Sequence, residues 1–271
     1  MDGIKMFHQS TPMETTDLPK TVEEAVALME ALRETDVLRQ PPATNSETLN
    51  ILVEGFPRVF SNRIQDAQEL GDFFNLDHEL RHYHNARHAV RVLQALQDNV
   101  PGITSYCPPG NISLSAHDAF ALWHDALYFT KGMPGASEQH SVGVFLDSLR
   151  DPTSLFIYDA ATVATAILAT QHHALFQRNL PRPILLMLDA DLCELGTDRY
   201  WVNGELIRRE LHRDGTPLNN FLIGRQKWLQ LMLSSRPHIF YTPEFSKYEE
   251  KARTNMELES LAISAILDGI G

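Results

Sequence analysis

Residues 81–98 read RHYHNARHAVRVLQALQD, and they carry a strong fold signal. Apolar residues recur at helical spacing over residues 86–98, which predicts an amphipathic helix there. The residues that share one side of this helix are Val90, Leu93 and Leu96. His84 and His88 are four residues apart, so both imidazoles can point into one cavity if the helix extends back to His84.

A second helix is predicted over residues 115–129, and it carries the pair His124-Asp125. Adjacent residues diverge by about 100° around a helix, an angle that still lets both side chains reach one ion beside the buried face. The pair His117-Asp118, seven residues earlier, is an alternative. The apolar flanks of His124-Asp125 favour it over the earlier pair, because a charged group in a buried setting needs a partner.

The remainder of the chain is also helical in its periodicity, and we find no convincing run of alternating strand residues. Further helices are predicted over residues 158–173, 184–195, 198–212, 218–234 and 242–267. The predicted fold class is therefore all-α, a helical bundle.

The N-terminal region is predicted to form a tail with a short accessory helix. Residues 1–20 are polar and aperiodic, whereas Thr21 and Glu24 make a capping box that opens a helix ending near Arg33. Breaker residues at 40–46 predict a linker. We accordingly expect residues 1–45 to form an N-terminal appendage and residues 46–271 to form the main domain.

Composition limits the function classes. The chain has 271 residues, 21% of them charged, and a net charge of -12. This negative charge disfavours nucleic acid polymers and anionic membranes as partners. Two cysteines, Cys107 and Cys193, are too few for a disulfide framework, and no membrane span or export signal is indicated, so a cytoplasmic location is expected. Assembly into a homo-oligomer is compatible with the sequence.

Histidines cluster in the middle of the chain: nine of the twelve fall between His78 and His173. The residues that could bind one divalent metal ion are His84 or His88, the pair His124-Asp125, and Asp191 as a fourth ligand from a separate helix. Mixed imidazole and carboxylate donors suit Mn, Fe, Ni, Zn, Co or Mg better than soft copper sites, and the residues do not choose among them. Asp189 is the alternative to Asp191 as the fourth ligand.

Three motifs resemble the predicted metal-dependent phosphohydrolases of the HD superfamily. They are YHNARHA (residues 83–89), LWHDALY (122–128) and LDADLCELG (188–196). The likeness continues to about residue 262, and it includes residues 207–210 and 249–259. The first motif also resembles cyclic nucleotide phosphodiesterases, which implies that His84 donates a proton and His88 binds metal. The same resemblance favours Asp191, which an aliphatic residue follows. One departure is at residues 137–141, where Glu138 is kept but the preceding Asn of the family is not.

The resemblance implies a metal-dependent hydrolase acting on phosphate esters or anhydrides of a small molecule, perhaps a nucleotide. A metal-activated water would attack phosphorus and His84 would protonate the leaving oxygen. Glu138 and His173 are expected to support the ligands or contact the substrate. A ligand-binding or regulatory module with little or no turnover, oxygen-dependent chemistry, and a two-metal centre remain alternatives.

Overall fold

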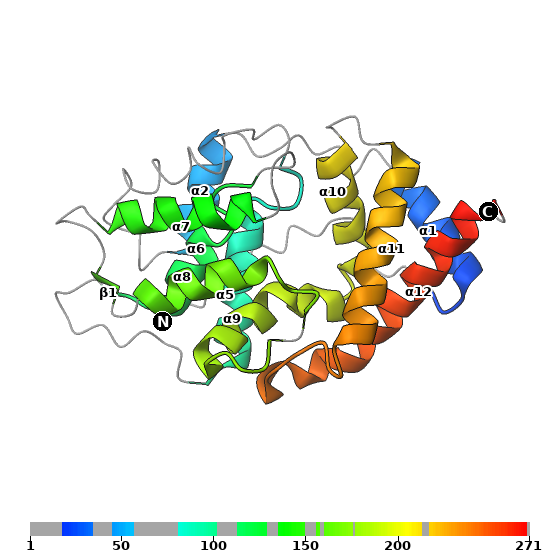
Figure 1. Cartoon of the computed structure of the whole chain (residues 1–271). Coiled ribbons are helices and arrows are strands. Elements are labelled where there is room, and N and C mark those ends of the chain that lie inside the picture. Colours follow the sequence, from blue (N-terminus) through cyan, green and yellow to red (C-terminus); the bar gives the residue numbers. More distant parts are fainter. Residues whose placement is uncertain are drawn as a thin grey trace, which may run out of the picture.

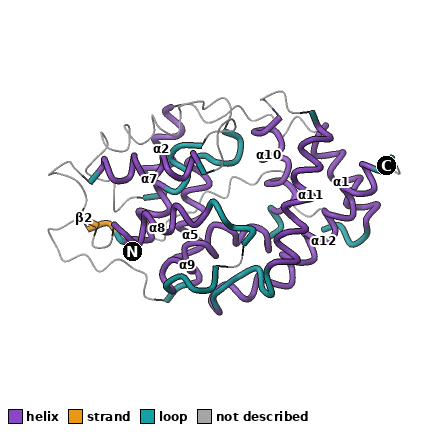
Figure 2. The backbone as a smooth tube through the Cα atoms, viewed as in Figure 1, coloured by secondary structure: helices purple, strands orange, loops and turns teal. Residues whose placement is uncertain are grey.

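The computed structural model describes residues 18–34, 45–56, 81–101, 113–128, 135–149, 156–157, 160–175, 177–212 and 217–269. Helices account for nearly all regular structure in these ranges, as Figure 2 shows. The exception is a pair of two-residue strands, β1 (Ser113–Leu114) and β2 (Phe156–Ile157), which run parallel. The predicted all-α fold class is confirmed.

The helices fall into two groups along the long direction of the molecule (Figure 1). The first group is α2 (Asn45–Gly55), α5 (Ala86–Asn99), α6 (Ala116–Trp123), α7 (Ala136–Ser148) and α8 (Ala160–Thr170). The second is α1 (Val22–Glu34), α10 (Tyr200–His212), α11 (Leu218–Ser235) and α12 (Glu249–Leu267). Helix α9 (Arg182–Leu192) packs against α5 and α8, and the 3-10 helix η3 (Cys193–Gly196) that follows it packs against α12. These two elements connect the groups.

Local sequence signals explain where several helices begin. Asn85 caps α5, because its side chain accepts a hydrogen bond from the backbone N–H of Arg87. Ser115 and Asp118 form a capping box at the start of α6. The segment predicted as one helix over 242–267 is instead divided into the 3-10 helix η4 (Pro243–Tyr248) and α12.

The N-terminal helix is packed against the C-terminal part of the chain. The expected capping box at Thr21 is present, since its Oγ1 accepts from the backbone N–H of Glu24 at 3.2 Å. Ala25 and Leu32 are buried as α1 packs on α12 and α10, and Arg209 donates to the Leu32 carbonyl at 3.3 Å. Helix α2 begins at Asn45, so the end of the predicted linker is helical. Residues 40–44 of that linker lie outside the described ranges, and the domain boundary stays a prediction.

In the described ranges, no helix combines the length and apolar character needed to cross a membrane.

Candidate metal centre

His88 projects from α5 into the core at the meeting point of α5, α6 and α9, and it is 2% exposed. The helix begins at Ala86 behind the Asn85 cap, as predicted, and does not extend back to His84, so the condition for a helical face shared by His84 and His88 is not met. His84 lies in a bent segment just before the helix, and its ring centroid is 6.0 Å from that of His88. The two imidazoles therefore remain neighbours although the Asn85 cap separates His84 from the helix.

His124 and Asp125 lie just beyond the end of α6 and not within a continuing helix, which corrects the prediction over 115–129. Two side chains from elsewhere bind the backbone that would have extended the helix. Arg81 donates to the carbonyls of Asp125 and Ala126 at 3.1 and 3.2 Å. Ser141 exchanges hydrogen bonds with the backbone of residue 127. The resulting turn brings the Asp125 carboxylate to 3.0 Å from His124 Nε2.

Asp191 comes from the last turn of α9 and completes the group. Its Oδ1 lies 2.9 Å from His88 Nε2 and 3.4 Å from His124 Nε2. His88 Nε2 is also 3.5 Å from Asp125 Oδ2. One donor atom from each of His88, His124, Asp125 and Asp191 lies within 4.8 Å of the others. The structure therefore brings all four predicted ligands together from α5, from the turn after α6 and from α9.

Asp189, the alternative ligand, is fully buried and points to a different part of the molecule. Its carboxylate accepts hydrogen bonds from the backbone N–H groups of Tyr241 and Thr242, both at 2.8 Å, and from the Thr242 hydroxyl at 2.6 Å. Burial raises the pKa of Asp189 to about 6, so the group is ionised at neutral pH. This residue anchors the segment before η4, and Asp191 is the one directed at the histidines.

We expect Asp189→Asn to destabilise the protein by about 1–3 kcal/mol, because the amide nitrogen would face buried N–H donors. Urea unfolding measures this loss. The folded variant should bind a divalent ion as well as the wild type, whereas Asp191→Asn should not. Normal ion binding by Asp191→Asn combined with loss in Asp189→Asn would reverse the two assignments.

The other alternative pair, His117-Asp118, serves the helix start. The Asp118 carboxylate accepts from the Ser115 hydroxyl at 2.7 Å as part of the capping box. His117 is not part of the metal-binding group found among the described residues. This pair therefore has no share in the candidate centre.

The donor atoms fit a divalent cation. His124 Nδ1 lies 3.1 and 3.2 Å from the carbonyl oxygens of Phe120 and Ala121, so Nδ1 carries the ring proton and donates it to them. Nε2 then has a free electron pair that can bind a metal ion. That buried Nε2 faces both carboxylates without hydrogen-bond geometry to any described group. Ligand atoms about 2.0–2.2 Å from one ion lie roughly 3–3.5 Å apart. The four distances from the histidine Nε2 atoms to the carboxylate oxygens, 2.9, 3.0, 3.4 and 3.5 Å, match this separation.

Electrostatics also favour a cation here. Burial disfavours a charge on His124, but Asp125 and Asp191 outweigh burial and raise the pKa of His124 well above its usual range. Burial dominates at His88 and lowers its pKa, which keeps that imidazole in the neutral form that binds metals. The two carboxylates that stabilise a proton on His124 would stabilise a metal ion in the same place.

His84 is held beside this group by contacts on both sides. Its Nδ1 is 2.9 Å from Oε2 of Glu210, a residue from α10 that is 1% exposed, and its ring stacks on Tyr128 at 3.9 Å between centroids. Burial opposes a charge on His84, but Glu210 and Asp125 outweigh it and raise the pKa. With Nδ1–H directed to Glu210, Nε2 is the ring nitrogen available for chemistry.

His173 contacts a candidate ligand, whereas no contact of Glu138 with one is found among the described residues. His173 follows α8, and its Nε2 is 2.8 Å from Oδ2 of Asp191, so it holds the second oxygen of that candidate ligand. Glu138 lies in the first turn of α7. Burial is the main cause that raises the pKa of Tyr128, and the negative charges of Glu210, Asp125 and Glu138 add to it. Among the described residues, no hydrogen bond or ion pair joins Glu138 to the four candidate ligands.

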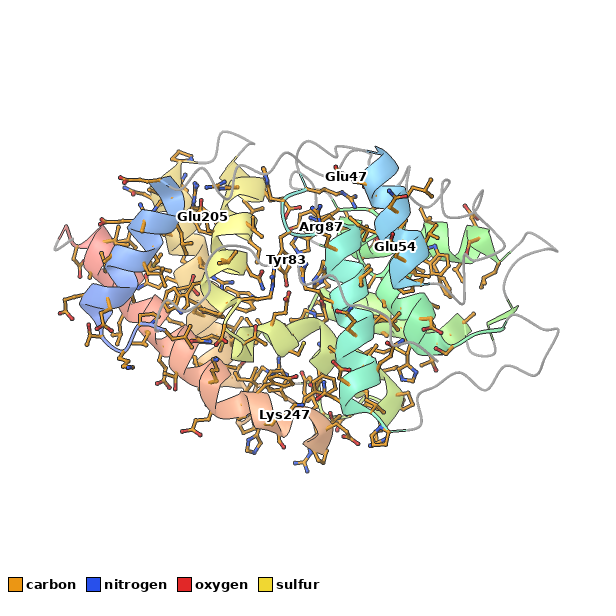
Figure 3. All side chains as sticks on the ribbon, turned by 180° about the vertical axis from the view of Figure 1, so that it is seen from behind. Glu47, Glu54, Tyr83, Arg87, Glu205 and Lys247 are labelled. Carbon is orange, nitrogen blue, oxygen red and sulfur yellow. The ribbon has the colours of Figure 1, made fainter. Side chains whose placement is uncertain are left out.

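A buried charge network behind His88 was not anticipated. Glu194 in η3 pairs with Arg91 at 2.9 Å and Arg199 at 3.2 Å, accepts from the Tyr83 hydroxyl at 3.4 Å, and lies 4.0 Å from His88 Nδ1. The Tyr83 ring also lies against the His88 ring, 4.7 Å between centroids, and Figure 3 shows Tyr83 near the middle of the molecule. Glu194 lies within the third motif, residues 188–196, and this position was the sequence feature that could have pointed to it.

Comparison with protein-family models, with curated proteins and with solved structures gave no match for this chain.

Proposed function

We propose that this chain is a metal-dependent phosphohydrolase of the HD type that acts on a phosphate ester or anhydride of a small molecule. The observation that carries the proposal is the placement of His84 beside the group of His88, His124, Asp125 and Asp191. A divalent-ion site with an adjacent, anchored proton donor is the arrangement that hydrolysis with a poor leaving group needs. The motifs at residues 83–89, 122–128 and 188–196 support the same class.

The protein's own groups divide the work. The four candidate ligands would hold the ion, which when bound supplies Lewis-acid polarisation and a water of lowered pKa. Glu210 fixes the His84 ring through Nδ1, so Nε2 can hold the proton destined for the leaving oxygen. His173 orients Asp191, and Arg81 fixes the turn that carries Asp125. Tyr128 covers one face of the His84 ring and limits its rotation.

Elemental analysis of the purified protein, followed by a screen of phosphorylated metabolites with added Mn²⁺, Mg²⁺, Ni²⁺ and Co²⁺, tests the proposal. We expect a bound divalent ion and release of inorganic phosphate or a phosphorylated product that chelation with EDTA abolishes. Addition of the ion should restore turnover. Tight ion binding without turnover on any substrate would favour a ligand-binding module, and absence of ion binding would reject the centre itself.

A further inference from the structure

The two ring nitrogens of His88 have different surroundings. Nε2 faces the candidate centre, 2.9 Å from Asp191 Oδ1 and 3.5 Å from Asp125 Oδ2. Nδ1 is buried and has no hydrogen-bond partner among the described residues. If Nε2 binds an ion, Nδ1 carries the ring proton, and a buried N–H donor without an acceptor is costly. A metal-binding histidine almost always donates this proton to a carboxylate, a carbonyl oxygen or a water, so the centre needs an acceptor at Nδ1.

Glu194 is the carboxylate that faces Nδ1. Its Oε2 lies 4.0 Å from His88 Nδ1 and accepts a hydrogen bond from the Tyr83 hydroxyl at 3.4 Å. Its Oε1 is instead paired with Arg91 at 2.9 Å and with Arg199 at 3.2 Å. The two guanidinium groups thus hold one oxygen of Glu194 and leave the other directed at Tyr83 and His88. A shift of about 1 Å would bring Nδ1 and Oε2 within the roughly 2.7–3.2 Å of an N–H···O hydrogen bond.

The segments that supply candidate ligands also supply this ion pair. Arg91 follows His88 by three residues on α5, and Glu194 in η3 follows Asp191 of α9 by three residues. Residues three apart lie on one face in both α-helices and 3-10 helices. The Arg91–Glu194 pair therefore lies beside the contact between the two candidate ligands and ties α5 to the end of α9. It helps to set the separation across which His88 and Asp191 reach one ion.

We propose that Glu194 is a positioning residue of the metal centre, with its Oε2 accepting the proton of His88 Nδ1. Arg91 and Arg199 hold its other oxygen in place. The contact fixes the tautomer and the ring orientation of His88, and the negative charge makes Nε2 a stronger donor to a cation. This inference rests on the proposed metal centre and adds to it a residue that does not itself touch the ion.

Glu194→Gln tests the contact in the full-length protein. An amide has one acceptor oxygen, which the two arginines would occupy, so its NH2 group would face the Nδ1–H of His88. We expect the Kd of the metal-free protein for Co²⁺, measured by competition with a chromophoric chelator, to rise by about 10–100-fold.

The double variant Glu194→Gln/Arg91→Gln separates the contact from the overall charge. It removes the guanidinium left unpaired by the single substitution and keeps the net charge of the wild type. It should bind Co²⁺ as weakly as the single variant, because neither has a carboxylate at Nδ1. It also carries the test should the single variant not fold.

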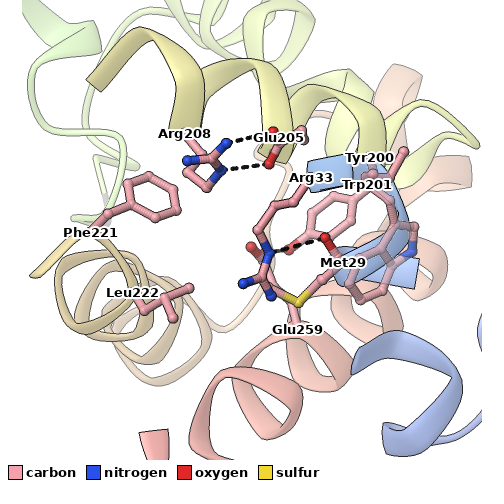
Figure 4. Close-up of a pocket in the computed structure, with 11 residues that line it drawn as sticks. Met29, Arg33, Tyr200, Trp201, Glu205, Arg208, Phe221, Leu222 and Glu259 are labelled. Carbon is pink, nitrogen blue, oxygen red and sulfur yellow. Dashed lines mark hydrogen bonds and ion pairs between the residues drawn. The ribbon is translucent and has the colours of Figure 1, made fainter. Parts of the chain in front are cut away.

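Glu205 provides the matched control, because it is similarly buried and also paired with two arginines. It is 7% exposed, against 8% for Glu194, and it binds Arg208 at 2.6 Å and Arg209 at 2.8 Å. Figure 4 shows its pair with Arg208 on α10, and no contact of Glu205 with a candidate ligand is found among the described residues. Glu205→Gln, alone and with Arg208→Gln, should bind Co²⁺ as the wild type does.

Thermal unfolding of the metal-free proteins separates packing from positioning. We expect lower stability in both Glu194→Gln and Glu205→Gln, but weaker Co²⁺ binding only in the Glu194 variants. Wild-type affinity in Glu194→Gln, recovery of affinity in the double variant, or equal weakening in Glu205→Gln would overturn the inference. A wild type that binds no Co²⁺ would reject the metal centre itself, a result distinct from a wild type that binds it and Glu194 variants that bind it equally well.

Discussion

His124→Ala should abolish metal binding and lower thermal stability. His124 is 2% exposed, and its Nε2 lies 3.0 and 3.4 Å from the two candidate carboxylate ligands. Its loss removes one of four donors and leaves two carboxylates facing each other, so the ion content should fall to ~10% or less of the wild-type value. An ion present at about 100 times its Kd stabilises the fold by about 2.7 kcal/mol, which is roughly 5–10 °C in Tm for a chain of this size.

The measurements are elemental analysis after reloading with metal and calorimetric unfolding with and without EDTA. EDTA should lower the Tm of the wild type and leave that of His124→Ala unchanged. His117→Ala is the matched control, because His117 is another histidine of the same segment and its Nε2 is also buried without a described partner. That variant should keep its ion and its sensitivity to EDTA. Full ion occupancy in His124→Ala would show that the group is not a metal centre.

Local sequence signals were sufficient to predict those helices whose bounds depend on their own residues alone. The predicted helix over 86–98 is α5, which runs one residue further, because both the Asn85 cap and the apolar periodicity are local features. The helix over 218–234 was predicted with similar accuracy and corresponds to α11. Such elements could be recognised without knowledge of the rest of the fold.

Tertiary contacts decided the elements that were predicted wrongly. Residues 115–129 keep a helical pattern to the end, but α6 stops at Trp123 because Arg81 and Ser141 bind the following backbone. Arg81 is 44 residues away from Asp125 in sequence, so no window around α6 contains that information. The same limit applies to the position of α1, since the packing of α1 on α12 is not encoded in either helix alone.

Within the site, the candidate ligands were predicted more fully than the residues that hold them. His88 and Asp191 are 103 residues apart, and the ordered motifs named both before the structure brought them to 2.9 Å. Glu210 and Glu194 were not assigned any role, because a glutamate on a helix is usually a solvated surface residue. Their roles are visible only in the folded structure. Glu210 contacts His84 there, and Glu194 contacts Arg91, Arg199 and Tyr83.

His84→Ala should lower turnover while leaving ion content near that of the wild type. His84 is absent from the group of donor atoms within reach of one ion, and its Nδ1 is engaged by Glu210 at 2.9 Å. Loss of a positioned proton donor typically lowers turnover by roughly 10²–10⁴-fold. Glu210→Gln should have a smaller effect, because the amide oxygen can still accept from Nδ1–H and position the ring.

The loss in His84→Ala should depend on the leaving group of the substrate. An alkyl phosphate ester needs protonation of the departing oxygen, whereas p-nitrophenolate leaves without it, so nitrophenyl esters should be affected far less. Steady-state kinetics with both substrates, together with elemental analysis of each variant, separate the roles. Equal losses on the two esters would exclude the proton donor, and loss of the ion would make His84 a ligand. Unchanged kinetics and ion content would leave His84 only its packing contact with Tyr128.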